Sequence, residues 1–375
     1  MAPQLVVAGT YVFAGDLVAN NIALRDTATG VWSTLGSGLD GIAYAVAVLP
    51  SGELVVGGSF GFAGGTPASC IAKWNGTSWS SLGSGMDGAV RALVVMPNGE
   101  LVAGGDFTVA GGIAASRVAR WNGNGWAPLG AGADGSVQAF ALQSNGDLIA
   151  VGAFLTADGV PVRQVARWNG TAWSAIGAPP WNVNVFWLTS VAVLPNGRLM
   201  VGGYSLSALS QAFLWQWDGT AWSSVAQITG GPSSLVLALG LAPNGDLLVS
   251  GLFQRVGTTN ALGIARWNGT TWSAMGAGLG DLVSSMTHLP NGDLVAGGRF
   301  TSNGLEFVGR LARFNGSVWQ PLDDSTNGSV TQVAPLASGD VVVGGTFTLS
   351  CTDSEWEFFG DGPHGTPSVA PNGNL

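Results

Sequence analysis

Few side chains in this 375-residue chain are of the types that perform catalysis. It has two histidines, His288 and His364, and three tyrosines, Tyr11, Tyr44 and Tyr204. A copper-radical oxidase site would need tyrosine and histidine ligands with a nearby cysteine, and these residues offer no matching spacing. The sequence contains no Gly-x-Ser-x-Gly elbow, zinc-binding histidine pair or phosphate loop. The two carboxylates of a glycosidase can lie far apart in sequence, so that class of enzyme stays open.

Several aspartates are followed directly by glycine and could supply oxygen ligands to a calcium ion. They are Asp40, Asp87 and Asp134, and Asp361 repeats the pattern near the C-terminus. Asp-Gly is also an ordinary turn dipeptide, so the same residues are expected where no ion binds. Metal binding is therefore one of two interpretations, and the sequence predicts no cofactor.

One segment gathers aromatic side chains. Residues 178–187, Ala-Pro-Pro-Trp-Asn-Val-Asn-Val-Phe-Trp, replace what is elsewhere a small, glycine-rich connection. Aromatic rings stack on sugars and pack against apolar partners, so Trp181, Phe186 and Trp187 are candidate ligand-binding residues. Phe186 and Trp187 can instead begin a strand and pack inward, which leaves Trp181 as the more open case.

Opposite charges recur at two fixed positions of the chain. An acidic residue begins one apolar stretch, and a basic residue stands near the end of the next. Antiparallel strands bring these two positions together, so we expect structural ion pairs rather than a ring of cations that binds anions. Where the acidic position is Arg198, the basic position is Gln216, so both members change together. The predicted pairs are Glu53–Lys73, Glu100–Arg120, Asp147–Arg167, Asp246–Arg266 and Asp293–Arg313.

These positions recur because the chain repeats itself. Each copy has four short apolar stretches, as in residues 89–96, 100–107, 116–121 and 125–129, separated by Pro-Asn-Gly or Trp-Asn-Gly turn sequences. Repeats of four short strands are typical of a β-propeller. A Gly-x-Phe/Tyr motif places eight aromatic residues in one column: Tyr11, Phe60, Phe107, Phe154, Tyr204, Phe253, Phe300 and Phe347.

The repeat resembles that of kelch-type propellers. Glycine doublets such as Gly57-Gly58 and Gly104-Gly105 precede a later tryptophan, and residues 26–32, Asp-Thr-Ala-Thr-Gly-Val-Trp, look like the family's Asp-x-x-Thr-x-x-Trp turn. The resemblance implies that the first strand of each repeat lies nearest a central axis. The doublets would then let neighbouring blades approach closely, and the tryptophans would fill the wider outer wedge. Kelch propellers include enzymes, adaptors and surface proteins, so the resemblance implies a fold and not a function.

We expect an all-β fold, a single closed β-propeller over residues 1–375 with eight four-stranded antiparallel blades. The last copy is shortened, so seven blades with an irregular tail is the alternative. The chain starts at a second strand and residues 363–375 resemble a first strand, so the N- and C-terminal strands should share one blade and leave no open edge. The predicted repeats cover residues 4–42, 43–88, 89–135, 136–187, 188–233, 234–281, 282–328 and 329–362, with a closing strand at 363–375.

Composition excludes some partners. The formal charge is −9 and only 9% of residues are charged, whereas nucleic-acid binding needs clustered Lys and Arg. No apolar run reaches eighteen residues, so no membrane insertion is expected. Residues 1–15 lack the pattern of a secretory signal, so the protein is expected to be cytosolic or to have an export signal outside this sequence. Cys70 and Cys351 cannot form a disulfide framework.

The sequence predicts a non-enzymatic propeller that acts as a binding or structural module. Low charge, an acidic pI and many polar turns favour an extracellular or cell-surface location. The loops between second and third strands, and between one repeat and the next, are the longer and more variable ones. They form the expected surface for a protein or glycan partner. A carbohydrate-binding (lectin-like) propeller that uses the aromatic segment and a glycan-active enzyme remain alternatives.

Overall fold

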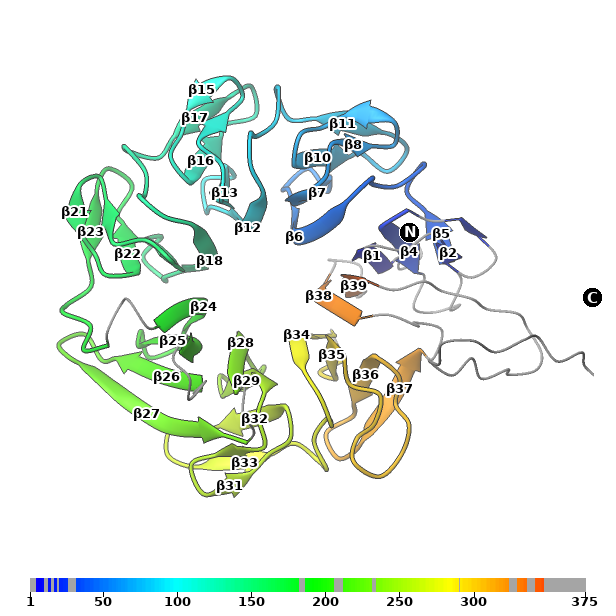
Figure 1. Cartoon of the computed structure of the whole chain (residues 1–375), viewed down its shortest axis with the longest axis vertical. Coiled ribbons are helices and arrows are strands. Elements are labelled where there is room, and N and C mark those ends of the chain that lie inside the picture. The colour runs from blue at the N-terminus through cyan, green and yellow to red at the C-terminus, as the bar shows by residue number, and fades with distance from the viewer. Residues whose placement is uncertain are drawn as a thin grey trace, which may run out of the picture.

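The computed structural model describes residues 5–9, 13–14, 17–18, 20–25, 32–181, 186–205, 212–230, 234–289, 291–323, 329–335 and 341–346. Its strands form sheets arranged around a central axis like the blades of a propeller (Figure 1). The residues described form strands and turns, and none of them belongs to a helix that could cross a bilayer.

Six blades have four antiparallel strands each, and we number them 1 to 6 in chain order. In blade 2, β12 (Val90–Val95) lies nearest the axis and is followed outward by β13 (Leu101–Gly105), β16 (Val118–Trp121) and β17 (Trp126–Pro128). The other five repeat this order. Blade 1 contains β6 (Ile42–Val48), β7 (Leu54–Ser59), β10 (Ile71–Trp74) and β11 (Trp79–Ser81); blade 3, β18 (Val137–Leu142), β19 (Leu148–Gly152), β22 (Val165–Trp168) and β23 (Trp173–Ala175); blade 4, β24 (Phe186–Val193), β25 (Leu199–Ser205), β26 (Ala212–Trp217) and β27 (Trp222–Thr229); blade 5, β28 (Leu235–Leu241), β29 (Leu247–Leu252), β32 (Ile264–Trp267) and β33 (Trp272–Ala274); blade 6, β34 (Val283–His288), β35 (Leu294–Gly298), β36 (Leu311–Phe314) and β37 (Trp319–Asp323).

Short hairpins interrupt the blades between their second and third strands. The hairpin of blade 2 consists of β14 and β15, and Figure 1 places β15 at the outer rim, near β17. These hairpins are β8 (Phe62–Ala63) with β9 (Thr66–Pro67), β14 (Val109–Ala110) with β15 (Ile113–Ala114), β20 (Thr156–Ala157) with β21 (Val160–Pro161), and β30 (Arg255–Val256) with β31 (Thr259–Asn260); β2 (Phe13–Ala14) and β3 (Leu17–Val18) form another near the N-terminus.

The two ends of the described chain share one sheet, which we call the seam sheet. β39 and β1 pair in parallel, with Val343 opposite Val7, whereas the other neighbours in this sheet are antiparallel. β38 contacts β34 on one side and β39 contacts β6 on the other, so the seam sheet completes the ring. Its strands in order are β38 (Ser329–Pro335), β39 (Val341–Thr346), β1 (Leu5–Gly9), β4 (Ile22–Arg25) and β5 (Trp32–Thr34).

The prediction of eight blades, and its alternative of seven, is wrong. The described residues form six blades. Five are four-stranded sheets, the sheet of blade 4 is extended to six strands by the β30–β31 hairpin, which pairs with β27, and the seam sheet has five strands. Among the described residues, the first copy of the repeat contributes β1, β4 and β5 to this sheet, and the last copy contributes β38 and β39. Two incomplete copies therefore join edge to edge through their second strands instead of forming two blades. The closing strand predicted at 363–375 lies outside the described residues.

Glycine doublets shape the inner part of blades 1, 2, 4 and 6, and blades 3 and 5 keep only the second glycine of the pair, Gly152 and Gly251. In blade 2 the register between β12 and β13 skips Arg91, which forms a β-bulge. A Cβ on Gly105 would collide with the carbonyl oxygen of Ala89, so the second glycine of the doublet makes room for the bulged strand. A Cβ on Gly104 would lie 2.6 Å from Cζ of Phe140 in blade 3, so the first glycine permits close packing of blades, as predicted.

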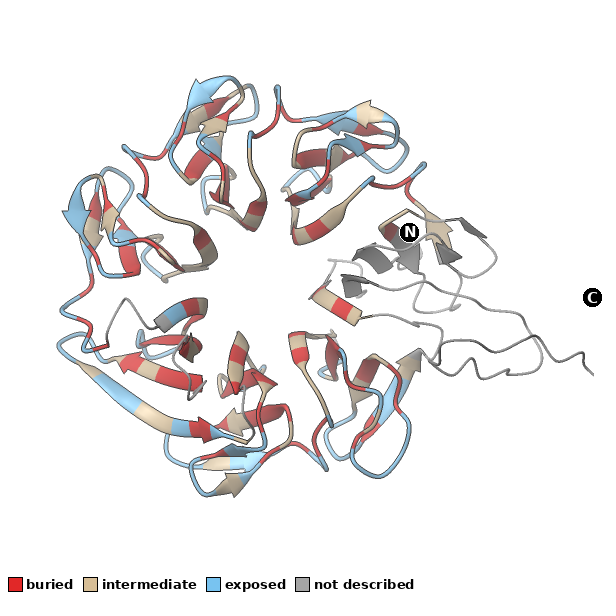
Figure 2. Ribbon diagram, viewed as in Figure 1, coloured by how far each residue is buried: buried red, intermediate tan, exposed pale blue. Residues whose placement is uncertain are grey.

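Tryptophans fasten the outer parts of neighbouring blades. The indole N–H of Trp126 donates a 2.8 Å hydrogen bond to the carbonyl oxygen of Leu82 in the preceding blade. Buried residues concentrate in the second and third strands of the six blades, the innermost strands are mostly of intermediate burial, and exposed residues gather in the outer hairpins (Figure 2). The same indole bond joins Trp79 to Leu35, Trp173 to Leu129, Trp222 to Ile176 and Trp319 to Met275.

Candidate functional site

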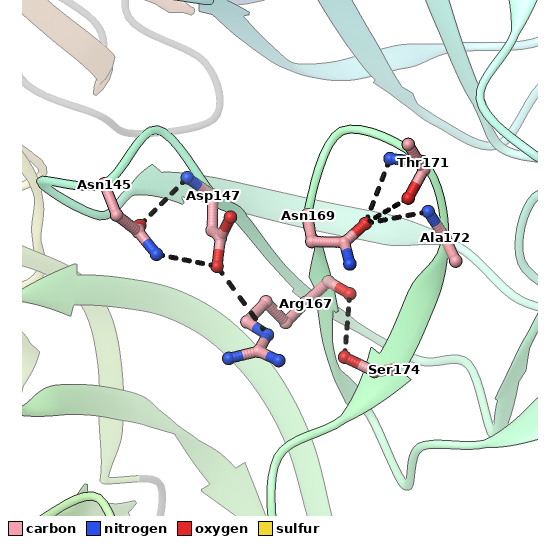
Figure 3. Close-up of polar contacts among 7 residues, drawn as sticks. All are labelled: Asn145, Asp147, Arg167, Asn169, Thr171, Ala172 and Ser174. Atoms are coloured by element: carbon pink, nitrogen blue, oxygen red, sulfur yellow. Dashed lines mark hydrogen bonds and ion pairs between the residues drawn. The ribbon is translucent and has the colours of Figure 1, made fainter.

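Alternating strand direction gives the propeller two unlike faces. We call the side that carries the turns after the first and third strands the turn face, and the opposite side, with the hairpins and the connections between blades, the loop face. Figure 3 shows the turn face of blade 3, where Asn145 of one turn and Asn169 of the other lie side by side. Asp147 and Arg167 form an ion pair between these two turns, at 3.8 Å.

All five predicted ion pairs are present on the turn face. Lys73 Nζ lies 2.7 Å from Glu53, and this hydrogen bond lowers the pKa of Glu53. Such partly exposed pairs contribute a few tenths of a kcal/mol each, so their role is to hold turns together. The others are Arg120–Glu100 at 3.5 Å, Arg167–Asp147 at 3.8 Å, Arg266–Asp246 at 2.6 Å, and Arg313–Asp293.

The candidate calcium ligands cap hairpins on the loop face. Asp134 accepts backbone hydrogen bonds from Leu155 and Thr156 at 2.7 and 2.9 Å. Asp40 does the same for Gly61 and Phe62, at 2.7 and 2.8 Å.

Asp87 forms the same cap in blade 2. Burial raises its pKa, but hydrogen bonds from Thr108 and Val109 outweigh this effect and lower the pKa overall. In all three aspartates the carboxylate oxygens serve as turn caps, and the metal role stays a prediction. Asp361 lies outside the described residues.

The three candidate aromatic residues are in different surroundings. Trp181 is only 4% exposed, packs against Trp215 and Trp222, and donates a 3.2 Å hydrogen bond to Gln164. Trp187 is 41% exposed, at the loop-face end of β24. The side chain of Phe186 lies outside the described part. The expectation for the two described rings is therefore wrong: Trp181, the more open case from the sequence, is buried, and Trp187, expected to pack inward, is exposed and placed to meet a ligand. The binding role stays a prediction.

Other chemistry-bearing residues stand apart from one another. His288 is half-buried in β34, and burial lowers its pKa. Cys70 is a free, partly buried thiol whose pKa burial raises. Where the structure describes the chain, no three His, Cys, Asp or Glu side chains gather in a way that could hold a metal ion.

A ring of bulged residues surrounds the axis near the loop face. Each innermost strand has one bulge near its loop-face end, and Figure 1 shows these strands closest to the axis. A bulge re-aims one side chain out of the regular ladder. Six of the seven bulged residues can form hydrogen bonds through their side chains. This bulge ring consists of Tyr44, Arg91, Gln138, Thr189, Leu237, Ser284 and Thr331.

A polar network connects the part of the bulge ring contributed by blades 1 to 3. Arg91 binds Asp106 through Nε and Nη2, at 2.8 and 2.6 Å, and its guanidinium stands 5.5 Å from the centre of the Tyr44 ring. The hydroxyl of Ser136 also hydrogen-bonds to Asp106. Gln138 donates a 2.8 Å hydrogen bond to Ser136. Side chains from three successive blades are thus held in one arrangement.

The network stabilises the charged forms of both Asp106 and Arg91. Burial raises the pKa of Asp106, but hydrogen bonds from Arg91 and Ser136 and the charge of Arg117 lower it overall. The hydrogen bond to Asp106 raises the pKa of Arg91. Arg117, at φ 67°, donates to the backbone oxygen of Asp106. Two cations around one carboxylate make this spot locally positive in a chain of net charge −9.

Sequence reasoning missed the bulge ring, although a signal was present. In each of the seven innermost strands the bulged residue stands fourteen positions before a glycine near the end of the second strand, as Arg91 stands before Gly105. Arg91 is also a charge inside an otherwise apolar stretch, which is expensive unless the charge is paired. The network holds a single carboxylate, so the paired-carboxylate chemistry of glycoside hydrolysis does not arise from it.

Comparison with known proteins supports the propeller fold. Residues 44–198, a stretch shorter than half of the chain, match the family described as the Rax2 C-terminal beta propeller domain. No curated protein sequence matches the chain.

Three solved structures share the fold at low identity. One is the extracellular domain of a hybrid two component system from B. thetaiotaomicron, at TM-score 0.55 and 12% identity over 82% of this chain, which spans 37% of that protein. The WD40 beta propeller domain of Doa1 has a TM-score of 0.51 and 16% identity, over 82% of this chain and 90% of that domain's chain. A catalytically inactive virginiamycin B lyase from Staphylococcus aureus, with quinupristin, has a TM-score of 0.51 and 11% identity. The match covers 78% of this chain and 88% of the lyase chain. These likenesses concern the β-propeller and do not distinguish the kelch type.

Proposed function

We propose that this β-propeller is a non-catalytic binding module whose ligand contacts the bulge ring on the loop face. One observation carries the proposal: a glycine of the second strand stands opposite each of the seven bulges, but the bulged residues themselves are almost all different. If the bulges only shaped the strands, the bulged residues would not need to differ from one blade to the next. Different polar groups arranged around one axis suit the recognition of a specific, asymmetric ligand.

A protein or a glycan fits this face better than a nucleic acid, because the chain is acidic overall. The hairpins of the loop face add exposed apolar side chains that would widen the footprint of a protein partner. These are Phe62, Ile113, Leu155, Val160, Leu305 and Phe307.

Substitution of Arg91 tests the proposal. Wild-type protein and Arg91→Ala would be compared on arrays of glycans and of folded proteins, followed by titration of each ligand found. Loss of Arg91 should weaken binding at least tenfold, because it removes the cation and frees Asp106. Arg266→Ala removes an arginine from a turn-face pair and should bind as the wild type does. Equal affinities for wild type and Arg91→Ala, or no ligand on either array, would overturn the proposal.

A carbohydrate ligand is the second candidate, because Trp187 is exposed at the same face. An aromatic ring next to mixed hydrogen-bond donors and acceptors is a common arrangement for sugar binding. Trp187→Ala should abolish glycan binding without loss of folding. Leu305→Ala, at an 84% exposed hairpin position, is the control that should leave it unchanged. Glycan binding that survives Trp187→Ala would contradict this candidate.

We further propose a kelch-type repeat and an extracellular or cell-surface location. The glycine doublets and residues 26–32 support the first, and the low charge and acidic pI support the second. The full reading frame of the gene tests the location through the presence or absence of an export signal. A frame without one would argue for the cytosol.

A further inference from the structure

On the turn face, successive blades touch through a proline and a glycine. The turn after the first strand reads Pro-x-Gly in most blades, and the proline ring approaches the turn glycine of the next blade. A Cβ on Gly99 would lie 3.7 Å from Pro50, one on Gly146 would lie 4.0 Å from Pro97, and one on Gly245 would lie 2.8 Å from Pro195.

Blade 3 interrupts this series. Its turn has Gln143-Ser144 where blade 4 has Leu194-Pro195. Gly197, in the next turn, then has no atom within 4 Å of where a Cβ would be placed. The contact is absent at Gly292 as well, although a proline stands in the preceding turn. At Gly197 the missing proline ring coincides with a cavity that Ser144 lines.

This cavity has a volume of about 500 Å³ and is bounded by blades 3, 4 and 5. Leu142, Val193 and Leu241, near the turn-face ends of the innermost strands, give it apolar walls, and Gln143 and Ser144 add an amide and a hydroxyl. No lining residue is charged. The volume lies in the usual range for small-molecule sites.

We propose that the cavity binds a small neutral molecule with an apolar body and one polar group. The apolar walls would cover the body, and desolvation of an ion with no countercharge would oppose a charged ligand. In the described part of the chain, the side chains of Gln143 and Ser144 make no hydrogen bond, so both can serve the polar group. The side chain of Asn145 is instead held by Asp147, since its Nδ2 donates to the Asp147 carboxylate and its Oδ1 accepts from the Asp147 backbone N–H (Figure 3).

This site is independent of the bulge ring, because it lies on the opposite face. Arg91→Ala should therefore leave binding at the cavity unchanged. Failure of one proposal would not affect the other.

The turn of blade 4 is the template for a variant of blade 3 in which the cavity is filled. Gln143→Leu combined with Ser144→Pro gives blade 3 the Leu-Pro-Asn-Gly turn of blade 4, and should fill the cavity with a proline ring that the fold already accepts. The probes are Nile red, a neutral amphipathic dye, followed by fluorescence, and benzamide and cyclohexanol, followed by ligand-observed NMR. We expect saturable one-to-one binding to wild type and at least tenfold weaker binding to the double variant.

Controls keep the result interpretable. Ser51→Asn changes a turn outside the cavity and should bind the probes as wild type does. If thermal melting shows that the double variant does not fold, Ser144→Leu fills the same space without a proline. Equal binding by wild type and the filled variant, or no saturable binding of any of the three probes to wild type, would overturn the proposal.

Discussion

At the scale of single residues, the turn after the third strand of blade 4 shows how backbone hydrogen bonds stabilise the charged form of one side chain. Asp218 follows the third strand of blade 4 and accepts backbone hydrogen bonds from Thr220 and Ala221, both at 2.8 Å. The carboxylate is stabilised as an anion, so its pKa falls to about 2. Other blades have asparagine in this place, at Asn75, Asn122, Asn169, Asn268 and Asn315.

Asp218 should therefore make the stability of the protein depend on acid. Its folded-state pKa, about 2, lies below the ordinary value of 3.8, so the stabilisation is present above pH 3.8 and is lost as the pH falls towards 2. Asp218→Asn keeps the accepting oxygen without the titration, so wild type should lose stability relative to this variant over that interval. Carbon-detected NMR of the Asp218 carboxyl measures the midpoint directly, and a midpoint near 3.8 would contradict the prediction.

At the scale of the elements, the bulged innermost strand depends on one glycine. Gly105 faces the carbonyl oxygen of Ala89 so closely that a Cβ cannot fit. Gly105→Ala should lower the free energy of unfolding by about 3 kcal/mol or more, because backbone must move to relieve the collision. Chemical denaturation measures the loss.

Gly125→Ala is the matched control in the same blade. A Cβ on Gly125 would have no other atom within 4 Å, and blade 3 already has an alanine, Ala172, at this position. The control should be as stable as wild type. If Gly105→Ala were equally stable, the bulge would not need its glycine.

The sequence predicts elements well and their assembly less well. Alternating apolar stretches and Asn-Gly turns predict the strands, and the antiparallel order predicts pairs such as Glu53–Lys73 because these follow from local chemistry. The bulge at Arg91 shifts the register by one residue, which apolar periodicity does not reveal. The cavity follows from Ser144 in place of proline, a small change whose effect depends on a glycine in the next blade. The blade count failed because a motif that occurs eight times gives no information on which copies of the repeat share a sheet.

At the scale of the whole molecule, closure depends on the seam sheet. β1 is an inner strand of this sheet, since Val7 pairs with Val343 of β39 on one side and with Ala23 of β4 on the other. The other strand pairs of the seam sheet are antiparallel, and each joins two strands that lie close together in the sequence. The parallel contact between β1 and β39 instead joins the two ends of the ring.

Val7→Pro should open this closure. Proline lacks the N–H that an inner strand must donate, and it belongs only on strand edges. We expect a loss of about 2–4 kcal/mol in unfolding free energy and a lower Tm. The freed edges should also promote self-association, which light scattering would detect. Ser144→Pro, in a turn that has proline in neighbouring blades, is the control that should keep the wild-type Tm and remain unaggregated. If Val7→Pro melted and scattered as wild type does, the ring would be held shut by the packing of the blades alone, without the parallel pairing of its two ends.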